Sequence, residues 1–192
     1  MGNAKRVALV TGSASGIGSA VAVRLANEGF DTIVNYSRSA DSASNTAERC
    51  NAAGSDTLLV QCDVSNEAGV VSMLDDIEKK YGRLDVVVNN AGTSISTLAK
   101  DFDKVSEEEF DRVFAVNVKG MFLVAKHSKA MLSEGIDPCI INTASIVGFR
   151  PGPQPLPYSA SKAAVISMTQ SLSFALAPKV RVKAVAPGWV EG

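Results

Sequence analysis

The sequence predicts an α/β fold built on a doubly wound parallel sheet with helices on both faces. Short apolar segments rich in β-branched residues alternate with longer segments of helical periodicity. The apolar segments are nearly continuous, which is typical of strands with both faces covered. Because no linker, repeat or low-complexity stretch interrupts this alternation in 192 residues, we expect one domain over residues 1–192.

Six strands are expected, and the stretches between the first five are long enough for crossover helices. In 66–81 the apolar residues fall at helical spacing, with Ser65 as the expected N-cap. Ser106 and Glu109 fit a capping box that opens another helix. The strand segments, in order, are RVALVTG (6–12), DTIVNY (31–36), DTLLVQCD (56–63), LDVVVNN (84–90), CIINTAS (139–145) and VRVKAVAPG (180–188).

The charge balance argues against nucleic acid or a membrane surface as a partner, because the formal net charge is -1 and no basic block is present. The opening MGNAKRVALVTG does not resemble a secretory signal, since its apolar run is short and ends in a glycine turn. No apolar run approaches the roughly 20 residues that span a bilayer. Arg6 stands where a myristoylation signal has Ser or Thr, so this modification is not expected.

The cysteines Cys50, Cys62 and Cys139 are odd in number, far apart and in no metal-ligand spacing. We interpret them as reduced apolar side chains in a cytoplasmic protein. The single histidine, His127, has no clustered Cys, Asp or Glu, so it is interpreted as a surface or hydrogen-bonded helix residue. No metal site is expected.

The first strand is followed by a glycine-rich turn, in VALVTGSASGIGSAV. In an open parallel sheet, ligands bind beyond the carboxyl ends of the strands, and a helix that starts there offers free N–H groups to a pyrophosphate. Gly12 could form the tight turn, Gly16 the close approach to a ligand, and Gly18 the packing of helix on strand. No Lys-Ser or Lys-Thr follows, which excludes a Walker-type loop. A purely structural glycine turn is the alternative.

The end of the second strand favours NADP over NAD. An acid usually binds the ribose 2′-hydroxyl there, whereas this chain has Ser37 and Arg38 in NYSRS. A guanidinium suits a 2′-phosphate and has little to do on a bare hydroxyl. The alternative is that Arg38 is a solvated surface charge and that the cofactor is NAD.

The stretch YSASK places Tyr158 and Lys162 four residues apart. On a helix these positions lie one turn apart on one face, where a phenol and an ammonium form an acid/base pair. They could also be ordinary side chains of a solvated helix.

The motifs TGSASGIG, NNAG, Asn117, Ser145, YSASK and PG stand in the order and spacing of the short-chain dehydrogenase/reductase family. The chain resembles its 3-oxoacyl-ACP reductase-like members from Lys5 to the last residue. The resemblance implies a Rossmann-type fold and Tyr158 as proton donor in ketone reduction. Lys162 would favour the phenolate and hold the nicotinamide ribose, and Ser145 would bind the substrate oxygen. Asn117 would sit mid-helix and carry a water linking Lys162 to solvent.

The same resemblance implies the cofactor-binding residues. Asp63 and Val64 would face the adenine, whereas Asn89 is interpreted as structural. Asn90, Ala91 and Gly92 would pass the adenosine side, and Pro187 and Gly188 the nicotinamide. The full expected set is Gly12, Ser15, Gly16, Ile17, Gly18, Ser37, Arg38, Asp63, Val64, Asn90, Ala91, Gly92, Tyr158, Lys162, Pro187 and Gly188.

The sequence departs from the family at its end, where it stops at PGWVEG with Gly192 in place of a common threonine. Family members usually continue with a substrate-covering segment, further helices and a seventh strand, without which the sixth strand is expected to be an exposed edge. Either the sequence is a fragment of a longer gene product, or the protein has lost part of its substrate pocket. The homo-oligomer expected for the family is in doubt for the same reason. The loop 148–157 should line the pocket of a small carbonyl or alcohol substrate.

Three functions remain open at this point. The first is an NADP-dependent oxidoreductase of ketones or secondary alcohols, resembling 3-oxoacyl reductases. The second is a non-catalytic nucleotide-binding or interaction protein derived from the family. The third is an S-adenosylmethionine methyltransferase, which would leave Tyr158 and Lys162 unexplained.

Overall fold

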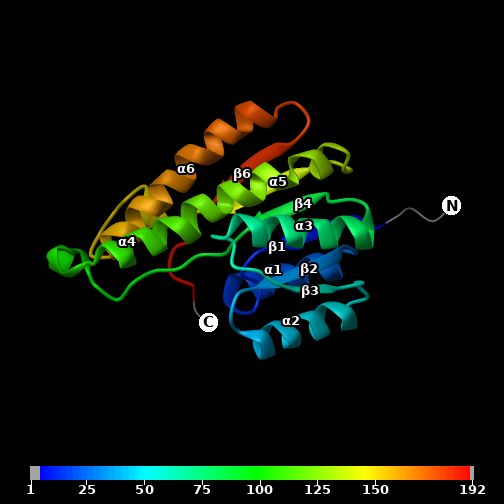
Figure 1. Ribbon diagram of the computed structural model, residues 1–192, viewed down its shortest axis with the longest axis horizontal. Helices are drawn as coiled ribbons and strands as arrows, with labels where there is room; N and C mark the ends of the chain where they lie inside the picture. The colour runs from blue at the N-terminus through cyan, green and yellow to red at the C-terminus, as the bar shows by residue number, and fades with distance from the viewer. Residues whose placement is uncertain (1–4, 191–192) are drawn as a thin grey trace.

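The computed structural model describes residues 5–190, so Gly192 lies outside the described residues. Its centre is a six-stranded parallel sheet of strand order β3-β2-β1-β4-β5-β6 (Figure 1). The predicted fold class is confirmed, and each strand lies inside its expected segment. The strands are β1 (Val7–Val10), β2 (Asp31–Tyr36), β3 (Leu58–Gln61), β4 (Val86–Asn89), β5 (Cys139–Thr143) and β6 (Arg181–Val185).

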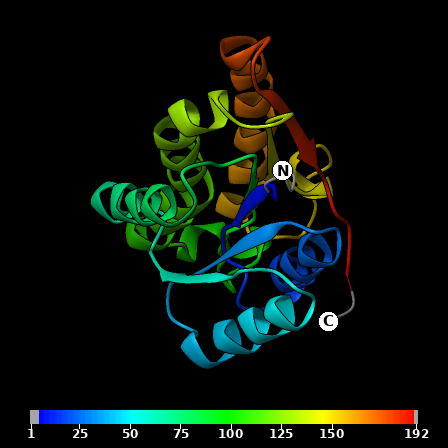
Figure 2. The ribbon, with the colours of Figure 1, turned by 90° about the vertical axis from the view of Figure 1, so that its right-hand side faces the viewer.

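Helices cover both faces of the sheet (Figure 2). One apolar core joins the sheet to α3 and α5, with α6 packed beside them, and a second core joins it to α1 and α2. Their bounds are α1 (Gly16–Asn27), α2 (Ala40–Ala52), α3 (Glu67–Tyr81), α4 (Glu107–Phe114), α5 (Met121–Ser133) and α6 (Leu156–Leu176), with a π-helical turn η2 (Ala115–Gly120) between α4 and α5 and 3-10 turns η1 (Ala99–Lys104) and η3 (Ile146–Gly148).

The expected N-cap of α3 is wrong by one residue. Asn66 is the cap, and its side-chain oxygen accepts a hydrogen bond from the Gly69 amide. The Ser65 hydroxyl instead donates to Asp63 Oδ1 at 2.7 Å, which leaves the next residue to cap the helix. The capping box of Ser106 and Glu109 is confirmed at the start of α4.

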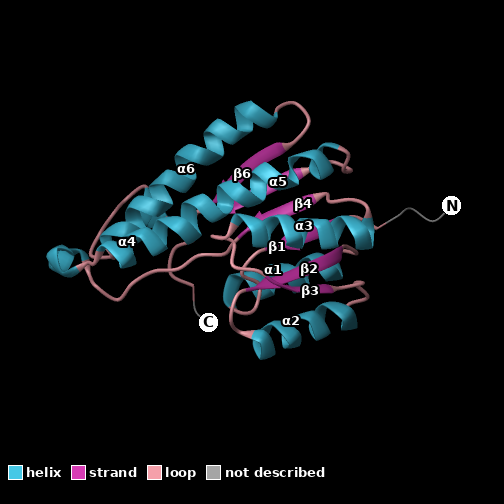
Figure 3. Ribbon diagram, viewed as in Figure 1, coloured by secondary structure: helices cyan, strands magenta, loops and turns pink. Residues whose placement is uncertain are grey.

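Figure 3 shows the place of the strands in the sheet, and their burial depends on this place. Every residue of β1 and β4, in the middle, is buried. The edge strand β3 exposes alternate residues and the edge strand β6 exposes most of its residues, so the expectation that both faces are covered holds only for the inner strands.

The three cysteines are buried and free, and burial raises the pKa of the Cys62 thiol to about 11. No helix between residues 5 and 190 has the length and apolar character needed to cross a membrane.

Candidate active site

The candidate site lies at the carboxyl end of the sheet, next to β1 and β4. From this point the connections run outward in opposite directions, to β2 and β3 on one side and to β5 and β6 on the other. A cavity of about 430 Å³ opens there. Its lining includes Ser15, Ile17, Gly18, Asn90, Gly92, Ser145, Tyr158, Lys162, Pro187 and Gly188. Residues from both halves of the chain therefore meet at one surface.

The glycine turn after β1 needs glycine at three positions for three reasons. Gly12 has a φ of +62°, and a Cβ there would lie 2.7 Å from Ala91 Cα. Gly16 also has a positive φ of +55°, but the space where its Cβ would be is open within 4 Å. At Gly18 a Cβ would lie 2.5 Å from Asn90 Nδ2. The turn is thus closed on its inner side and open at Gly16, where a ligand can reach the backbone.

Two asparagines hold this turn in place. Asn90 Nδ2 donates to the carbonyl of Gly12 at 3.0 Å, across from β4. Asn35, at the end of β2, accepts from the Gly12 amide and donates to the Cys62 carbonyl after β3. Asn35 was not among the expected residues, because nothing in NYSRS distinguishes its amide from a loop polar group.

The start of α1 is equipped to bind a phosphate. Ser15 is its N-cap residue and makes no side-chain cap hydrogen bond. The first-turn N–H groups, which have no partner inside a helix, therefore point to the cavity together with the positive end of the helix dipole. Uncapped donors beside the open Gly16 fit the pyrophosphate of a dinucleotide.

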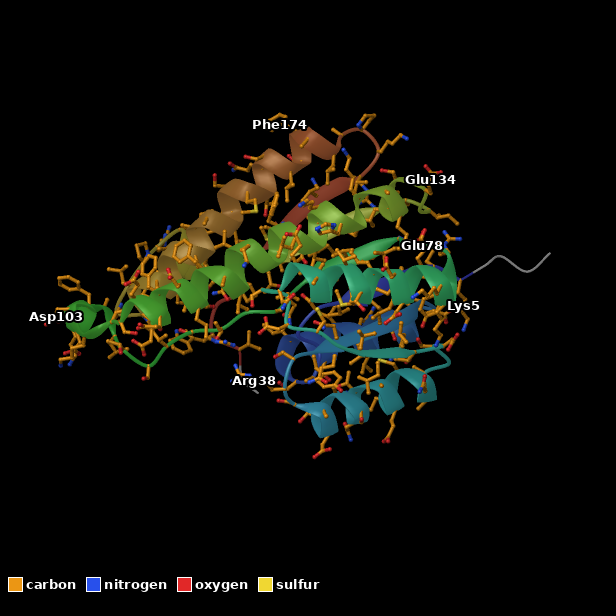
Figure 4. All side chains as sticks on the ribbon, in the orientation of Figure 1. Lys5, Arg38, Glu78, Asp103, Glu134 and Phe174 are labelled. Atoms are coloured by element: carbon orange, nitrogen blue, oxygen red, sulfur yellow. The ribbon has the colours of Figure 1, made fainter. Side chains whose placement is uncertain are left out.

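A second cavity of about 130 Å³ continues from the first, with which it shares Gly92 and Thr93. Ser37, Arg38, Asp63 and Val64 line it, as does Arg112 of α4. In Figure 4, Arg38 lies at the carboxyl end of the sheet, opposite Lys5, Glu78 and Glu134. Most of the residues expected around the adenosine therefore line this second cavity, called the adenosine-side cavity below, whereas Asn90 lines the larger one.

Lys162 is buried on α6 and is tied to the end of β5. Its Nζ donates to the Thr143 carbonyl at 2.7 Å and lies 5.6 Å from the centre of the Tyr158 ring. Burial lowers the pKa of the Lys162 ammonium to about 8, because an apolar environment disfavours the charged form. At neutral pH this ammonium is thus mostly protonated, but close to its titration.

Ser145 follows β5 by two residues and faces the same cavity as Tyr158. Its hydroxyl is only loosely engaged, with the Val147 amide at 3.4 Å and the Pro187 carbonyl at 3.5 Å. A smaller cavity of about 170 Å³ is lined by Ser145 and Tyr158 and also by Gln154 and Trp189. Ser145 and Tyr158 therefore line the same two cavities.

Asn117 lies behind the cavity and not on its wall. Its Nδ2 donates to the Thr93 carbonyl and to Ser161 Oγ, both at 2.9 Å, and its Oδ1 accepts from the Thr93 amide at 2.7 Å. It sits in the π-helical turn η2, where a simple helix was expected. Its side chain joins the loop after β4 to α6, the helix that carries Tyr158 and Lys162.

The loop 148–157, expected to line the substrate pocket, does contribute Gln154 to the smaller cavity. Sequence reasoning missed Arg112, which lines the adenosine-side cavity. Arg112 is in a helix, away from any strand end, and no local pattern separates it from its neighbours.

Comparison with known proteins gives consistent matches. A family model described as short chain dehydrogenase matches residues 6–192. Elsinochrome reductase 1 of Elsinoe fawcettii is 39% identical over 97% of this chain and 68% of its own length. The 3-oxoacyl-acyl-carrier-protein reductase FabG of Staphylococcus aureus is 36% identical over 95% of this chain and 74% of its own. The structure of NAD+-bound xylitol dehydrogenase superposes with a TM-score of 0.92 at 30% identity, over 99% of this chain and 73% of that one.

The family match covers the three cavities, the glycine turn and the Tyr158–Lys162 pair. The resemblance drawn from the motifs is thereby confirmed. The chain belongs to the short-chain dehydrogenase/reductase family, whose members are oxidoreductases that use a nicotinamide dinucleotide.

Proposed function

We propose that this protein is an NADP-dependent oxidoreductase that interconverts a ketone and a secondary alcohol through Ser145, Tyr158 and Lys162. The observation that carries the proposal is the meeting of these three side chains on one cavity, next to the uncapped start of α1. Family membership removes the methyltransferase alternative, since it accounts for Tyr158 and Lys162.

The nicotinamide, when bound, supplies the hydride that reduces the ketone. The Tyr158 hydroxyl then donates its proton to the substrate oxygen, which becomes negative as the carbonyl is reduced. The Ser145 hydroxyl donates a hydrogen bond to the same oxygen and stabilises the charge. The Lys162 ammonium, held on the Thr143 carbonyl, favours the phenolate that remains. In alcohol oxidation Tyr158 accepts the proton.

The expected cofactor residues support dinucleotide binding by their positions. Gly12, Ser37, Arg38, Asp63 and Val64 line the adenosine-side cavity, and Ala91 and Gly92 pass beside it. Among residues 5–190 the Arg38 guanidinium has no acidic partner, and β2 does not end in an acid, which supports NADP. The similar xylitol dehydrogenase was solved with NAD+ bound, so NAD is the alternative.

The choice between the two nucleotides rests on Arg38. We expect Arg38→Ala to reduce the ratio of NADPH to NADH affinity at least tenfold, because a charge-assisted bidentate contact to the 2′-phosphate is lost. Fluorescence titration with each nucleotide measures this ratio. An unchanged ratio would contradict the role of Arg38.

The substrate class follows from the smaller cavity and from the relatives. Its wall combines the apolar Ile146, Val147 and Trp189 with the amide of Gln154. A wall of this kind suits a ketone with an apolar body and a second polar group. The relatives include a 3-oxoacyl reductase, so we propose a 3-oxoacyl-like substrate.

The test is NADPH oxidation with acetoacetyl-coenzyme A and with a panel of aromatic ketones. We expect Tyr158→Phe to lower kcat by about 10²–10⁴-fold with NADPH affinity retained. Tyr81→Phe is the matched control, because this phenol hydrogen-bonds the Asp56 carbonyl far from the cavities. Near-normal turnover by Tyr158→Phe would overturn the mechanism. Tight NADPH binding by the wild type without turnover of any ketone would favour the non-catalytic alternative.

A further inference from the structure

Arg112 shares the adenosine-side cavity with Arg38, although the two residues come from different elements of the fold. Arg38 follows β2, whereas Arg112 projects from α4. Both side chains are solvent-accessible and both line the same 130 Å³ cavity, with the Asp63 carboxylate on its wall. Two guanidinium groups therefore face one carboxylate.

Neither guanidinium has a protein partner among residues 5–190. No acidic oxygen lies within 4.0 Å of Arg38 or Arg112, and neither side chain makes a hydrogen bond to a described residue. Asp63 is engaged elsewhere, since it accepts from the Ser65 hydroxyl at 2.7 Å and the Ser65 amide at 3.0 Å. A pair of unpaired guanidiniums over a cavity is typical of an anion site.

The helix keeps Arg112 free by turning its own acids away. Glu108 and Glu109 precede Arg112 by four and three residues, where helical ion pairs form readily. Glu109 instead accepts from the Ser106 amide in the capping box. Hydrogen bonds at the helix start, first from its own amide and then from Ser106, lower the pKa of Glu108. The Glu109 carboxylate is thus directed to the first turn of α4, away from Arg112.

The charges of the cavity show what Arg112 adds. Arg38 and Asp63 alone sum to zero, so a dianionic phosphate would be attracted only through direct contact with Arg38. The fields of Arg112 and Arg38 both reach Asp63, because after the Ser65 bonds they help to lower the pKa of its carboxyl. Arg112 therefore offsets Asp63 and leaves the cavity with a net positive charge.

We propose that Arg112 is a second residue that determines cofactor specificity, by making this cavity cationic for a nucleotide that carries a 2′-phosphate. The proposal rests on the proposed NADP dependence and deepens it. Arg112 acts by offsetting the charge of Asp63, and this role does not require contact with the 2′-phosphate.

The test is fluorescence titration of the full chain with NADPH and with NADH at low and at physiological salt. Arg112→Ala is expected to weaken NADPH binding about 5–30-fold and NADH binding less than threefold, with the difference shrinking at higher salt. Arg112→Lys should retain most of the preference, since it keeps the charge. Lys129→Ala is the matched control, because it removes an exposed charge of α5 outside the cavity. Circular dichroism melts establish that each variant is folded.

A double variant tests whether Arg112 acts by offsetting the charge of Asp63 or by contacting the 2′-phosphate directly. Asp63→Asn can still accept from Ser65, and combined with Arg112→Ala it returns the cavity to the charge of the wild type. We expect the double variant to regain the NADPH preference that Arg112→Ala loses. If the double variant does not regain this preference, Arg112 does not act by offsetting the charge of Asp63, and the proposal is overturned.

The remaining outcomes are distinct. An equal loss of NADPH and NADH affinity in Arg112→Ala would mean that this side chain contacts the adenine, and would overturn the proposal. A wild-type preference for NADPH that Arg112→Ala leaves unchanged would overturn the role of Arg112 alone. A wild-type preference for NADH would overturn the NADP assignment, and the role of Arg112 with it.

Discussion

The Lys162 ammonium donates a 2.7 Å hydrogen bond to the carbonyl of Thr143, two residues before Ser145. This bond joins the helix that carries Tyr158 to the strand that leads to Ser145. The geometry of the proposed catalytic groups therefore depends on a charged group held in a largely buried place.

Lys162→Met should change how stability depends on pH. Burial lowers the pKa of Lys162 to about 8 in the folded chain, from 10.5 when unfolded. Between these values the unfolded chain binds more protons, so stability rises with pH; below pH 8 the penalty of the buried charge is fully present. We expect the wild type to gain on the order of 2–3 kcal/mol relative to Lys162→Met from pH 8 to 10.5.

Urea unfolding of both proteins across this range measures the difference. Lys179→Met, which replaces an exposed lysine after α6, is the control. Parallel curves for wild type and Lys162→Met would show that the Lys162 pKa is not lowered.

Gly18→Ala should weaken both nucleotide binding and the fold. The new Cβ would press on Asn90 Nδ2, the group that holds the glycine turn. We expect a loss of about 1–3 kcal/mol in stability and a loss of NADPH affinity of at least tenfold. Gly69→Ala, inside α3 with its nearest contact 3.4 Å away at Cys62 Sγ, should keep both. Wild-type affinity in Gly18→Ala would contradict the tight packing.

Asp85→Asn should be strongly destabilising at neutral pH. Asp85 is fully buried before β4 and accepts from Arg83, Val7 and Ile136. Burial alone would raise the pKa of its carboxyl, but these bonds outweigh burial and lower it. The stabilisation is present above about pH 4 and is lost as pH falls through the lowered pKa.

We expect Asp85→Asn to cost about 3 kcal/mol at pH 7, and the difference from wild type to narrow in acid. Thermal melts of both proteins from pH 7 to 2.5 measure this difference in stability. Asp76→Asn, in an exposed pair with Lys79, should cost less than about 1 kcal/mol throughout. A small effect of Asp85→Asn at pH 7 would show that the buried pair contributes little.

Thr169→Val should loosen the attachment of α6 to the sheet. Asn89 donates to Asn142 Oδ1, and Asn142 donates to Thr169 Oγ1, both at 2.9 Å in the interior. Valine keeps the shape of threonine but leaves the buried Asn142 side-chain amide without its acceptor, which should lower the stability by about 1–3 kcal/mol. Thr169→Ser should retain the bond and stay closer to wild type in urea unfolding. Equal losses in both variants would point to packing instead of the hydrogen bond.

The sequence predicted what depends on local pattern. The strands, the glycine turn and the Tyr158–Lys162 spacing each have a recognisable sequence pattern that spans only a few residues. It did not predict Asn66 as the cap of α3, because the competing bond from Ser65 to Asp63 is a matter of loop geometry. Nor did it predict the link from Asn117 to Thr93, or that Arg112 lines the same cavity as Arg38. Such contacts join residues far apart in the chain, and only the packed structure brings them together.

The central place of β1 in the sheet also determines when its two edges can pair during synthesis on the ribosome. Its outer neighbour β2 emerges early, but its other neighbour β4 arrives only when Val86 has been made, to pair with Ala8. Until then a fully apolar strand edge stays open, and such an edge invites pairing with other nascent chains. Completion of the nucleotide-binding half is therefore a slow, non-local step, and a chaperone that shields β1 should raise the yield of folded protein.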